Sequence, residues 1–126
     1  MAEALYRVEL TDSFVARLHA IEAFLTEADA AFAYDDLLAS LRATVVPNLA
    51  RFPLMGRRYL DQPPQSVEAL EHLSQMPAGA ADGLRVYLHG DYLMLYVAMD
   101  ANATVYLLSI RHHRQLSFDF AGLWPA

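Results

Sequence analysis

The last third of the chain constrains the fold most, because it is typical of three β-strands joined by short turns. Leu84–His89 alternates in polarity with the two-residue period of a strand. Tyr92–Met99 is predicted to be the strand that pairs with it. Between them, Gly90-Asp91 fits the Gly-X pattern of a two-residue type II′ hairpin turn. After the turn at residues 100–103, a third strand is predicted from Thr104 to about His112. The pattern therefore predicts an antiparallel meander.

The predicted last strand changes character at its end. Residues 104–110 are mostly apolar, and the cluster Arg111-His112-His113-Arg114 follows directly. Core packing gives no reason for four cationic or titratable groups in a row, because such side chains are rarely buried. The change predicts that this strand end lies on a functional surface.

A strand and an amphipathic helix are predicted at the N-terminus. Residues 4–10 alternate as a half-buried strand, and Thr11 or Asp12 can cap the helix that follows. Apolar residues recur at helical spacing in this helix, at Phe14, Leu18, Ile21 and Leu25.

A second helix is predicted from Asp29 to about Val46. Its apolar stripe consists of Tyr34, Leu38, Leu41 and Val45. Pro47 lacks a backbone N–H and is expected to break or kink this helix, although a final turn over residues 48–51 could continue past it. The short connection over residues 28–31 predicts that the two helices pair as an antiparallel hairpin.

Together these elements predict a single domain over residues 1–126 with an α+β fold. The N-terminal strand, the antiparallel helix hairpin and the three-stranded antiparallel meander are expected to form one sheet, with the helices packed on one face. The strand residues Tyr92, Met94 and Tyr96 are interpreted as core beneath the helices. Residues 60–81 are expected to be an inserted loop with a short helix, because prolines at 63 and 64 interrupt the chain. Arg57-Arg58 is placed in a loop, where it could contact an anion or pair with the acidic first helix.

Composition narrows the class of protein. The chain has 126 residues and no stretch of roughly 20 apolar residues that could cross a bilayer. Its start does not resemble a signal peptide, and the absence of cysteine makes the cytoplasm the expected compartment. A net charge of −6 argues against a general nucleic-acid binder. All nine basic residues are arginine.

The chain also contains four short motifs in a definite order, which are Tyr6–Thr11, Leu49–Arg57, Asp91–Tyr96 and Leu107–Gln115. In this combination they resemble the RelE/ParE superfamily of toxins from bacterial type II toxin–antitoxin systems. The resemblance covers nearly the whole chain, although residues 60–81 are longer than the family pattern. It implies a small cytoplasmic toxin that a co-expressed antitoxin holds inactive. RelE-like members cut messenger RNA in the ribosome, whereas ParE-like members block DNA gyrase without a known catalytic reaction.

The end of the last strand looks closer to the ParE-like branch. Residues 110–114 are similar to its hydrophobic-x-His-x-Arg ending, with His112 and Arg114 at the matching positions. RNA-cleaving members often carry an aromatic residue where Arg114 stands, and they are strongly basic. The leading hypothesis is therefore a gyrase-binding toxin without substrate turnover. Its predicted target-binding residues are Arg85, Arg111, His112 and Arg114.

Two alternatives stay open. A ribosome-dependent mRNA endoribonuclease would use His113 for proton transfer and Arg85 and Arg111 for phosphate contacts. Strand alternation places Arg111 and His113 on one face and His112 on the other. The second alternative is a degenerate toxin-fold protein that only binds its antitoxin.

The apolar tail after the last strand is a candidate antitoxin contact. Its aromatic residues Phe118, Phe120 and Trp124 could cover their own domain or meet the antitoxin, since aromatic residues are frequent binding hot spots. No metal site is predicted, because the adjacent His112 and His113 would point to opposite faces of a strand. No glycine-rich phosphate loop indicates a cofactor.

Overall fold

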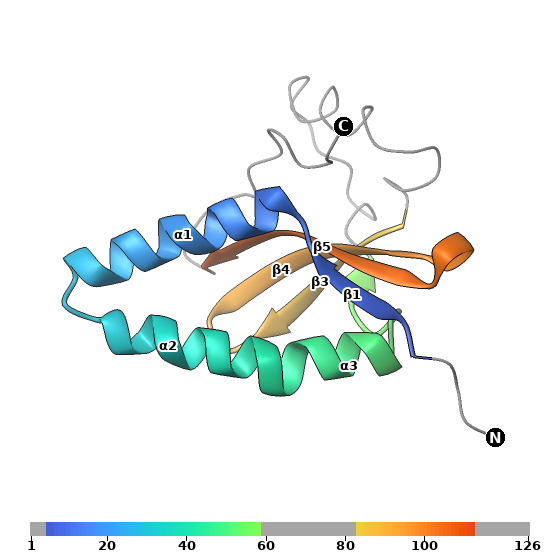
Figure 1. Cartoon of the computed structure of the whole chain (residues 1–126), viewed down its shortest axis with the longest axis horizontal. Helices are drawn as coiled ribbons and strands as arrows, with labels where there is room; N and C mark the ends of the chain where they lie inside the picture. Colours follow the sequence, from blue (N-terminus) through green and yellow to red (C-terminus); the bar gives the residue numbers. More distant parts are fainter. Residues whose placement is uncertain (1–4, 59–82, 113–126) are drawn as a thin grey trace.

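The computed structural model describes residues 5–58 and 83–112, which form a five-stranded mixed sheet and a helical hairpin (Figure 1). The strands are β1 (Arg7–Leu10), β2 (Arg57–Arg58), β3 (Leu84–His89), β4 (Tyr92–Met99) and β5 (Thr104–His112). Their order in the sheet is β1-β5-β4-β3-β2. β1 runs parallel to β5, and the other neighbours are antiparallel. The predicted α+β fold and its meander are confirmed.

Two helical segments connect β1 to the rest of the sheet. The first is α1 (Asp12–Glu27); the second runs through α2 (Ala31–Ser40), the π-helical turn η1 (Leu41–Val45) and α3 (Val46–Arg51). The two segments splay apart from the turn that joins α1 to α2, and the strands cross the opening between them (Figure 1). The predicted helix hairpin is confirmed.

The helix continues past Pro47 as the predicted final turn allowed, and it widens just before the proline instead of breaking. In η1 the Val46 N–H bonds to the Leu41 carbonyl, five residues back, which is the spacing of a π turn. A proline ring normally clashes with the carbonyl of the preceding helical turn, and the wider turn gives the ring room. The helix therefore continues through Pro47 and ends at Arg51.

Thr11 fixes the start of α1 and ties this helix to the sheet. Its Oγ1 accepts a hydrogen bond from the Phe14 N–H at 3.3 Å. The same hydroxyl donates to the Leu107 carbonyl of β5 at 2.9 Å. The predicted cap is thus confirmed at Thr11, and the side chain is buried.

Replacing Thr11 with alanine is expected to lower the free energy of unfolding by about 1–2 kcal/mol. The change removes the cap and one of the two donors to the Leu107 carbonyl, which keeps the bond from the Thr11 backbone N–H at 3.1 Å. Thr11→Ser keeps the hydroxyl and is the matched control. Urea unfolding followed by circular dichroism measures both, and equal losses in the two variants would contradict the capping role.

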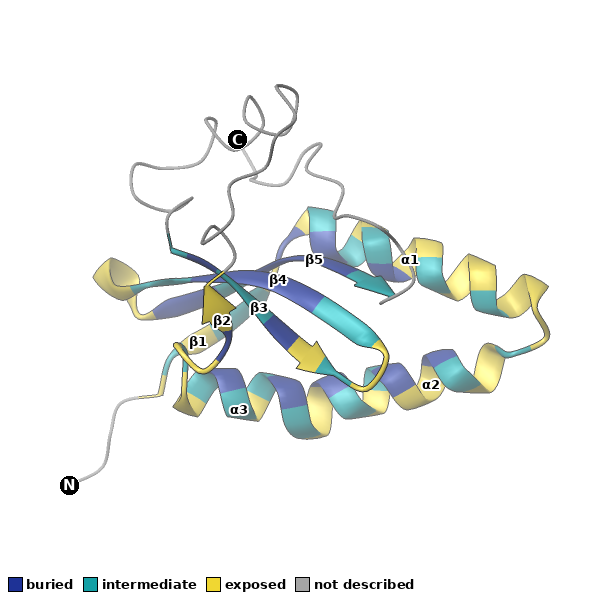
Figure 2. Cartoon of the chain, turned by 180° about the vertical axis from the view of Figure 1, so that it is seen from behind, coloured by how far each residue is buried: buried dark blue, intermediate teal, exposed yellow. Residues whose placement is uncertain are grey.

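The main core lies between the helices and one face of the sheet. Figure 2 shows buried positions along the middle of both β4 and β5, whereas the helices are mostly exposed toward the α1–α2 turn. The buried members of this core are Phe14, Leu18, Leu37, Leu41, Val45, Leu49, Tyr87, Met94, Tyr96, Val105, Leu107 and Ile110. The predicted assignment of Met94 and Tyr96 to the core is confirmed, and Tyr92 packs against it.

β2 corrects one sequence-based prediction. Arg57-Arg58 lies in a strand and not in a loop, with Arg57 opposite Val86 and Arg58 opposite Arg85 of β3. Both residues of β2 are exposed. A two-residue strand shows no periodicity, so the Gly56 that precedes it is the one local feature and favours a loop.

The meander has two turns, one between β3 and β4 and one between β4 and β5, and each contains a residue with a positive φ. Gly90 has a φ of 58° while Asp91 keeps a negative φ, which agrees with the predicted type II′ turn. Between β4 and β5, the short 3₁₀ helix η3 (Asp100–Asn102) is followed by Ala103 in the left-handed region, with a φ of 49°.

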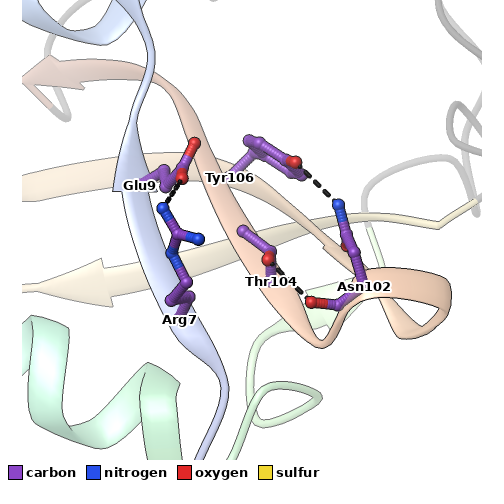
Figure 3. A network of polar contacts seen from close by, with 5 residues as sticks. All are labelled: Arg7, Glu9, Asn102, Thr104 and Tyr106. Atoms are coloured by element: carbon purple, nitrogen blue, oxygen red, sulfur yellow. Dashed lines mark hydrogen bonds and ion pairs between the residues drawn. The ribbon is translucent and has the colours of Figure 1, made fainter.

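Polar contacts hold the start of β5 beside this turn (Figure 3). The Asn102 side-chain amide donates to the Tyr106 hydroxyl at 2.9 Å, and the Thr104 hydroxyl donates to the Asn102 carbonyl at 3.0 Å. On the neighbouring β1, Arg7 and Glu9 form an exposed ion pair of 2.8 Å. Such an exposed pair contributes little to stability. The two hydrogen bonds of Asn102 are therefore the more important contacts in this region.

A bulge in β5 changes the direction of the strand's last side chains. Leu107 pairs with Tyr96, but the next pair joins Ser109 to Leu95, which leaves Leu108 as an extra residue. Side chains alternate across a strand, and one inserted residue reverses the alternation beyond it. Ile110 and then His112 therefore face the helices.

The prediction for residues 60–81 lies outside the described ranges. In the described part of the chain, no helix has both the length and the apolar character that a membrane crossing needs.

Candidate protein-binding groove

A groove of about 670 Å³ lies where the α1–α2 end of the hairpin meets the tips of β4 and β5. Its walls are mostly apolar and its polar groups are few. The lining residues are Arg17, Ala20, Ile21, Phe24, Leu25, Ala33, Asp91, Tyr92, Ile110 and His112. A concave apolar surface with a few placed polar groups is typical of a binding site.

The sheet contributes His112 to this groove. His112 pairs with Tyr92 across β4 and β5, and the two rings meet edge to face with centroids 5.5 Å apart. The β5 bulge is the reason for this placement, because regular alternation from Leu107 would have turned Arg111 toward the helices. The predicted site residue His112 thus lies in the groove.

The helix contributes a residue that the sequence interpretation missed. Arg17 lines the groove one helical turn before Ile21, and it therefore borders the same space as His112. Asp91, from the β3–β4 turn, adds a carboxylate to the lining. A signal for Arg17 was present, since it lies between Phe14 and Ile21 near the apolar stripe of its helix. The sequence did not indicate that the end of β5 would lie at the same groove as Arg17.

The structure does not bring the two predicted arginines together. Arg85 pairs with Tyr96 on the face of the sheet that carries the helices. Arg111 pairs with Leu93, one position from the Tyr92–His112 pair, and so belongs to the opposite face. Arg85 and Arg111 therefore point away from each other on β3 and β5, with β4 between them.

Arg85 holds the loop before β2. Its Nη1 donates to the Gly56 carbonyl at 2.7 Å and to the Leu54 carbonyl at 3.1 Å. Beside it, the Gly56 N–H donates to the Tyr96 hydroxyl at 2.8 Å. This guanidinium therefore has a structural task in the described chain, distinct from the groove.

The other predicted site residues lie outside the described ranges. These are His113 and Arg114 at the strand end, and Phe118, Phe120 and Trp124 in the tail. Within residues 5–58 and 83–112, no group of three or more His, Asp or Glu residues is placed to hold a metal ion.

Several tyrosines of the core and groove resist ionisation. Burial raises the pKa of Tyr92, and the neighbouring Asp91 carboxylate raises it further. Burial also raises the pKa of Tyr96, although the hydrogen bond from Gly56 and the charge of Arg85 partly offset this rise. The pKa of Tyr34 is raised mainly by burial as well. These phenols therefore stay neutral in the folded chain above the pH at which an unfolded tyrosine ionises.

Alkaline pH is accordingly expected to destabilise the protein. Below about pH 10, the ordinary pKa of tyrosine, both states keep the phenol protons and this contribution to stability is fully present. Above it the unfolded chain loses protons first, so the free energy of unfolding falls as pH rises toward the higher folded pKa values. Urea titrations from pH 8 to 11 measure the slope. Tyr92→Phe should make the slope shallower, and an unchanged slope would contradict the assignment.

Comparison with known proteins gives the class of this chain. Its sequence matches the family described as "ParE toxin of type II toxin-antitoxin system, parDE" over residues 8–117. The match and the fold together define a type II toxin of the RelE/ParE superfamily. Because the match spans most of the sequence, the chain belongs to the ParE toxin family. The predicted resemblance is confirmed.

A solved structure is also similar to this chain. It is a chain of the toxin–antitoxin complex RelBE2 from Mycobacterium tuberculosis, with 22% sequence identity and a TM-score of 0.46. The similarity covers 86% of this chain and 98% of that chain. No curated protein matches the sequence.

Proposed function

We propose that this toxin inhibits growth by binding DNA gyrase, without turning over a substrate, and that a cognate antitoxin neutralises it. The observation that carries the proposal is the separation of Arg85 and Arg111 onto opposite faces of the sheet, in a chain of the ParE family. RNA cleavage would need phosphate-contacting cations and a proton-transfer group around one scissile bond. Arg85 and Arg111 do not converge on such a point.

The charge of the chain supports the same proposal. A net charge of −6 offers little attraction for RNA phosphates, whose neutralisation by cations dominates nucleic-acid affinity. The groove instead combines apolar walls with Arg17, Asp91 and His112, which suits a protein surface with mixed polar groups. We place the gyrase contact at this groove, which contains His112. Arg111 and Arg114 stay target contacts predicted from the sequence.

Induction of the chain without its antitoxin tests this function. Plasmid supercoiling reports gyrase activity, and mapping of messenger RNA ends reports cleavage in the same cells. Loss of negative supercoiling without new RNA ends is the expected result. Cuts in messenger RNA would instead favour ribosome-dependent cleavage, and normal growth at full expression would favour a degenerate toxin.

His112→Ala tests the place of the contact. The substitution removes the imidazole from the groove. The inducer concentration needed for growth inhibition is expected to rise about tenfold or more, as for the loss of a hot-spot residue. His89→Ala is the matched control, because His89 lies on β3, stacks on Tyr87 and does not line the groove. Equal activity of both variants would place the target contact elsewhere.

A further inference from the structure

The loop between α3 and β2 forms a second surface, and none of its residues lines the groove. Three large apolar side chains stand exposed on it, with exposed fractions of 55% for Phe52, 60% for Leu54 and 48% for Met55. A single exposed apolar residue is ordinary, but three within four positions form a patch of the kind that marks an interaction site. We name residues 52–55 the apolar loop.

Hydrogen bonds hold the backbone of the apolar loop, although its large apolar side chains are exposed. Arg85 binds the Leu54 and Gly56 carbonyls, and the buried Tyr96 hydroxyl accepts the Gly56 N–H. Within the loop, the Met55 N–H donates to the Phe52 carbonyl at 3.1 Å. A backbone that is fixed in advance loses little conformational entropy on binding. The hydrogen bonds thus present Leu54 and Met55 as preorganised anchors.

Positive charge surrounds the apolar loop. Arg51 at the end of α3 and Arg57 at the start of β2 flank it, and both are exposed. Arg58 and Arg85 lie directly opposite each other on β2 and β3, which adds to the local positive charge. From Leu37 to Leu60 the sequence contains four arginines and no acidic residue. A partner that covers this surface must therefore supply carboxylates around an apolar face.

We propose that the apolar loop, flanked by Arg51 and Arg57, docks an acidic amphipathic segment of the antitoxin. Leu54 and Met55 would pack against the apolar face of that segment, and the arginines would pair with its carboxylates. The inference rests on the proposed function in so far as it takes the antitoxin as the partner. Guanidinium–carboxylate pairing gives orientation and association rate, while the apolar anchors supply most of the affinity.

The test measures binding of the protein encoded beside this chain's gene, titrated by calorimetry into the full-length toxin. Leu54→Ser combined with Met55→Ser is expected to weaken binding about tenfold or more. Phe32→Ser is the matched control, since Phe32 is an equally exposed apolar residue at the start of α2, and its affinity should stay within about twofold. Equal thermal unfolding of the variants confirms that all are folded.

Arg57→Gln tests the acidic character of the partner segment. Removal of this charge is expected to weaken binding and to reduce its dependence on salt concentration. An unchanged salt dependence would overturn the acidic assignment. If the double variant binds as tightly as the unmodified toxin, the docking surface is wrong while the proposed function stands. If the unmodified toxin does not bind the neighbouring protein, the docking proposal and the assignment of that protein as the antitoxin are both overturned, while gyrase inhibition still depends on the supercoiling result.

Discussion

Replacing Phe14 with alanine is expected to lower the free energy of unfolding by about 3–5 kcal/mol. Phe14 is fully buried at the start of α1 and belongs to the core between the helices and the sheet. The substitution removes a large apolar side chain, and the surrounding core can close the cavity only in part. The position is also next to the Thr11 cap, which limits how far the helix can shift to refill the space.

Phe24→Ala gives a control in the same helix and with the same change. Phe24 is 68% exposed near the end of α1, so its removal should change the free energy of unfolding by roughly 0.5 kcal/mol or less. Urea unfolding at neutral pH measures both variants. Similar losses of unfolding free energy at the two positions would contradict the assignment of Phe14 to the core.

Gly56→Ala is expected to lower the free energy of unfolding by at least about 2 kcal/mol. A Cβ atom at this position would lie 2.7 Å from the Tyr96 ring, its hydroxyl and the Val86 carbonyl. Two of these neighbours are a fully buried ring and a strand backbone, and neither can move without disturbing the sheet. The substitution should also weaken the hydrogen bond between the Gly56 N–H and Tyr96.

Gly90→Ala separates this crowding from the effect of losing any glycine. Gly90 has a positive φ of 58°, and a Cβ atom added there would meet no atom beyond those of its chain neighbours within 4 Å. Alanine at this position should therefore lower the free energy of unfolding by only about 1 kcal/mol, through backbone strain. Thermal unfolding compares the two variants directly. A larger loss at Gly90 than at Gly56 would contradict the packing of the loop against Tyr96.

Regular periodicity made most of the fold predictable. The spacing of Phe14 and Leu18 indicated the buried side of α1, and Gly90-Asp91 indicated the β3–β4 turn. Both features act over a few residues, so the sequence carries them locally. The final helical turn after Pro47 was considered from the sequence, but the wider turn that precedes it was not predictable, because no local pattern marks it.

The groove was only partly predictable for a different reason. His112 was identified from its position after an apolar strand, but its orientation depends on the extra residue Leu108. Val105, Leu107, Leu108 and Ile110 are all buried, so the sequence of β5 has no alternation that would reveal a bulge. Arg17 and Asp91 join His112 only through tertiary packing, which no local pattern encodes.

The extra residue in β5 also predicts how this scaffold responds to the loss of one residue. Deleting Leu108 would join Leu107 directly to Ser109, and both already lie in register with Tyr96 and Leu95 of β4. The strand would become regular while Ile110 and His112 kept their side of the sheet. A structure of the deletion variant would then show His112 still lining the groove, so the loss of this codon would smooth the strand without exchanging the side chains at its tip.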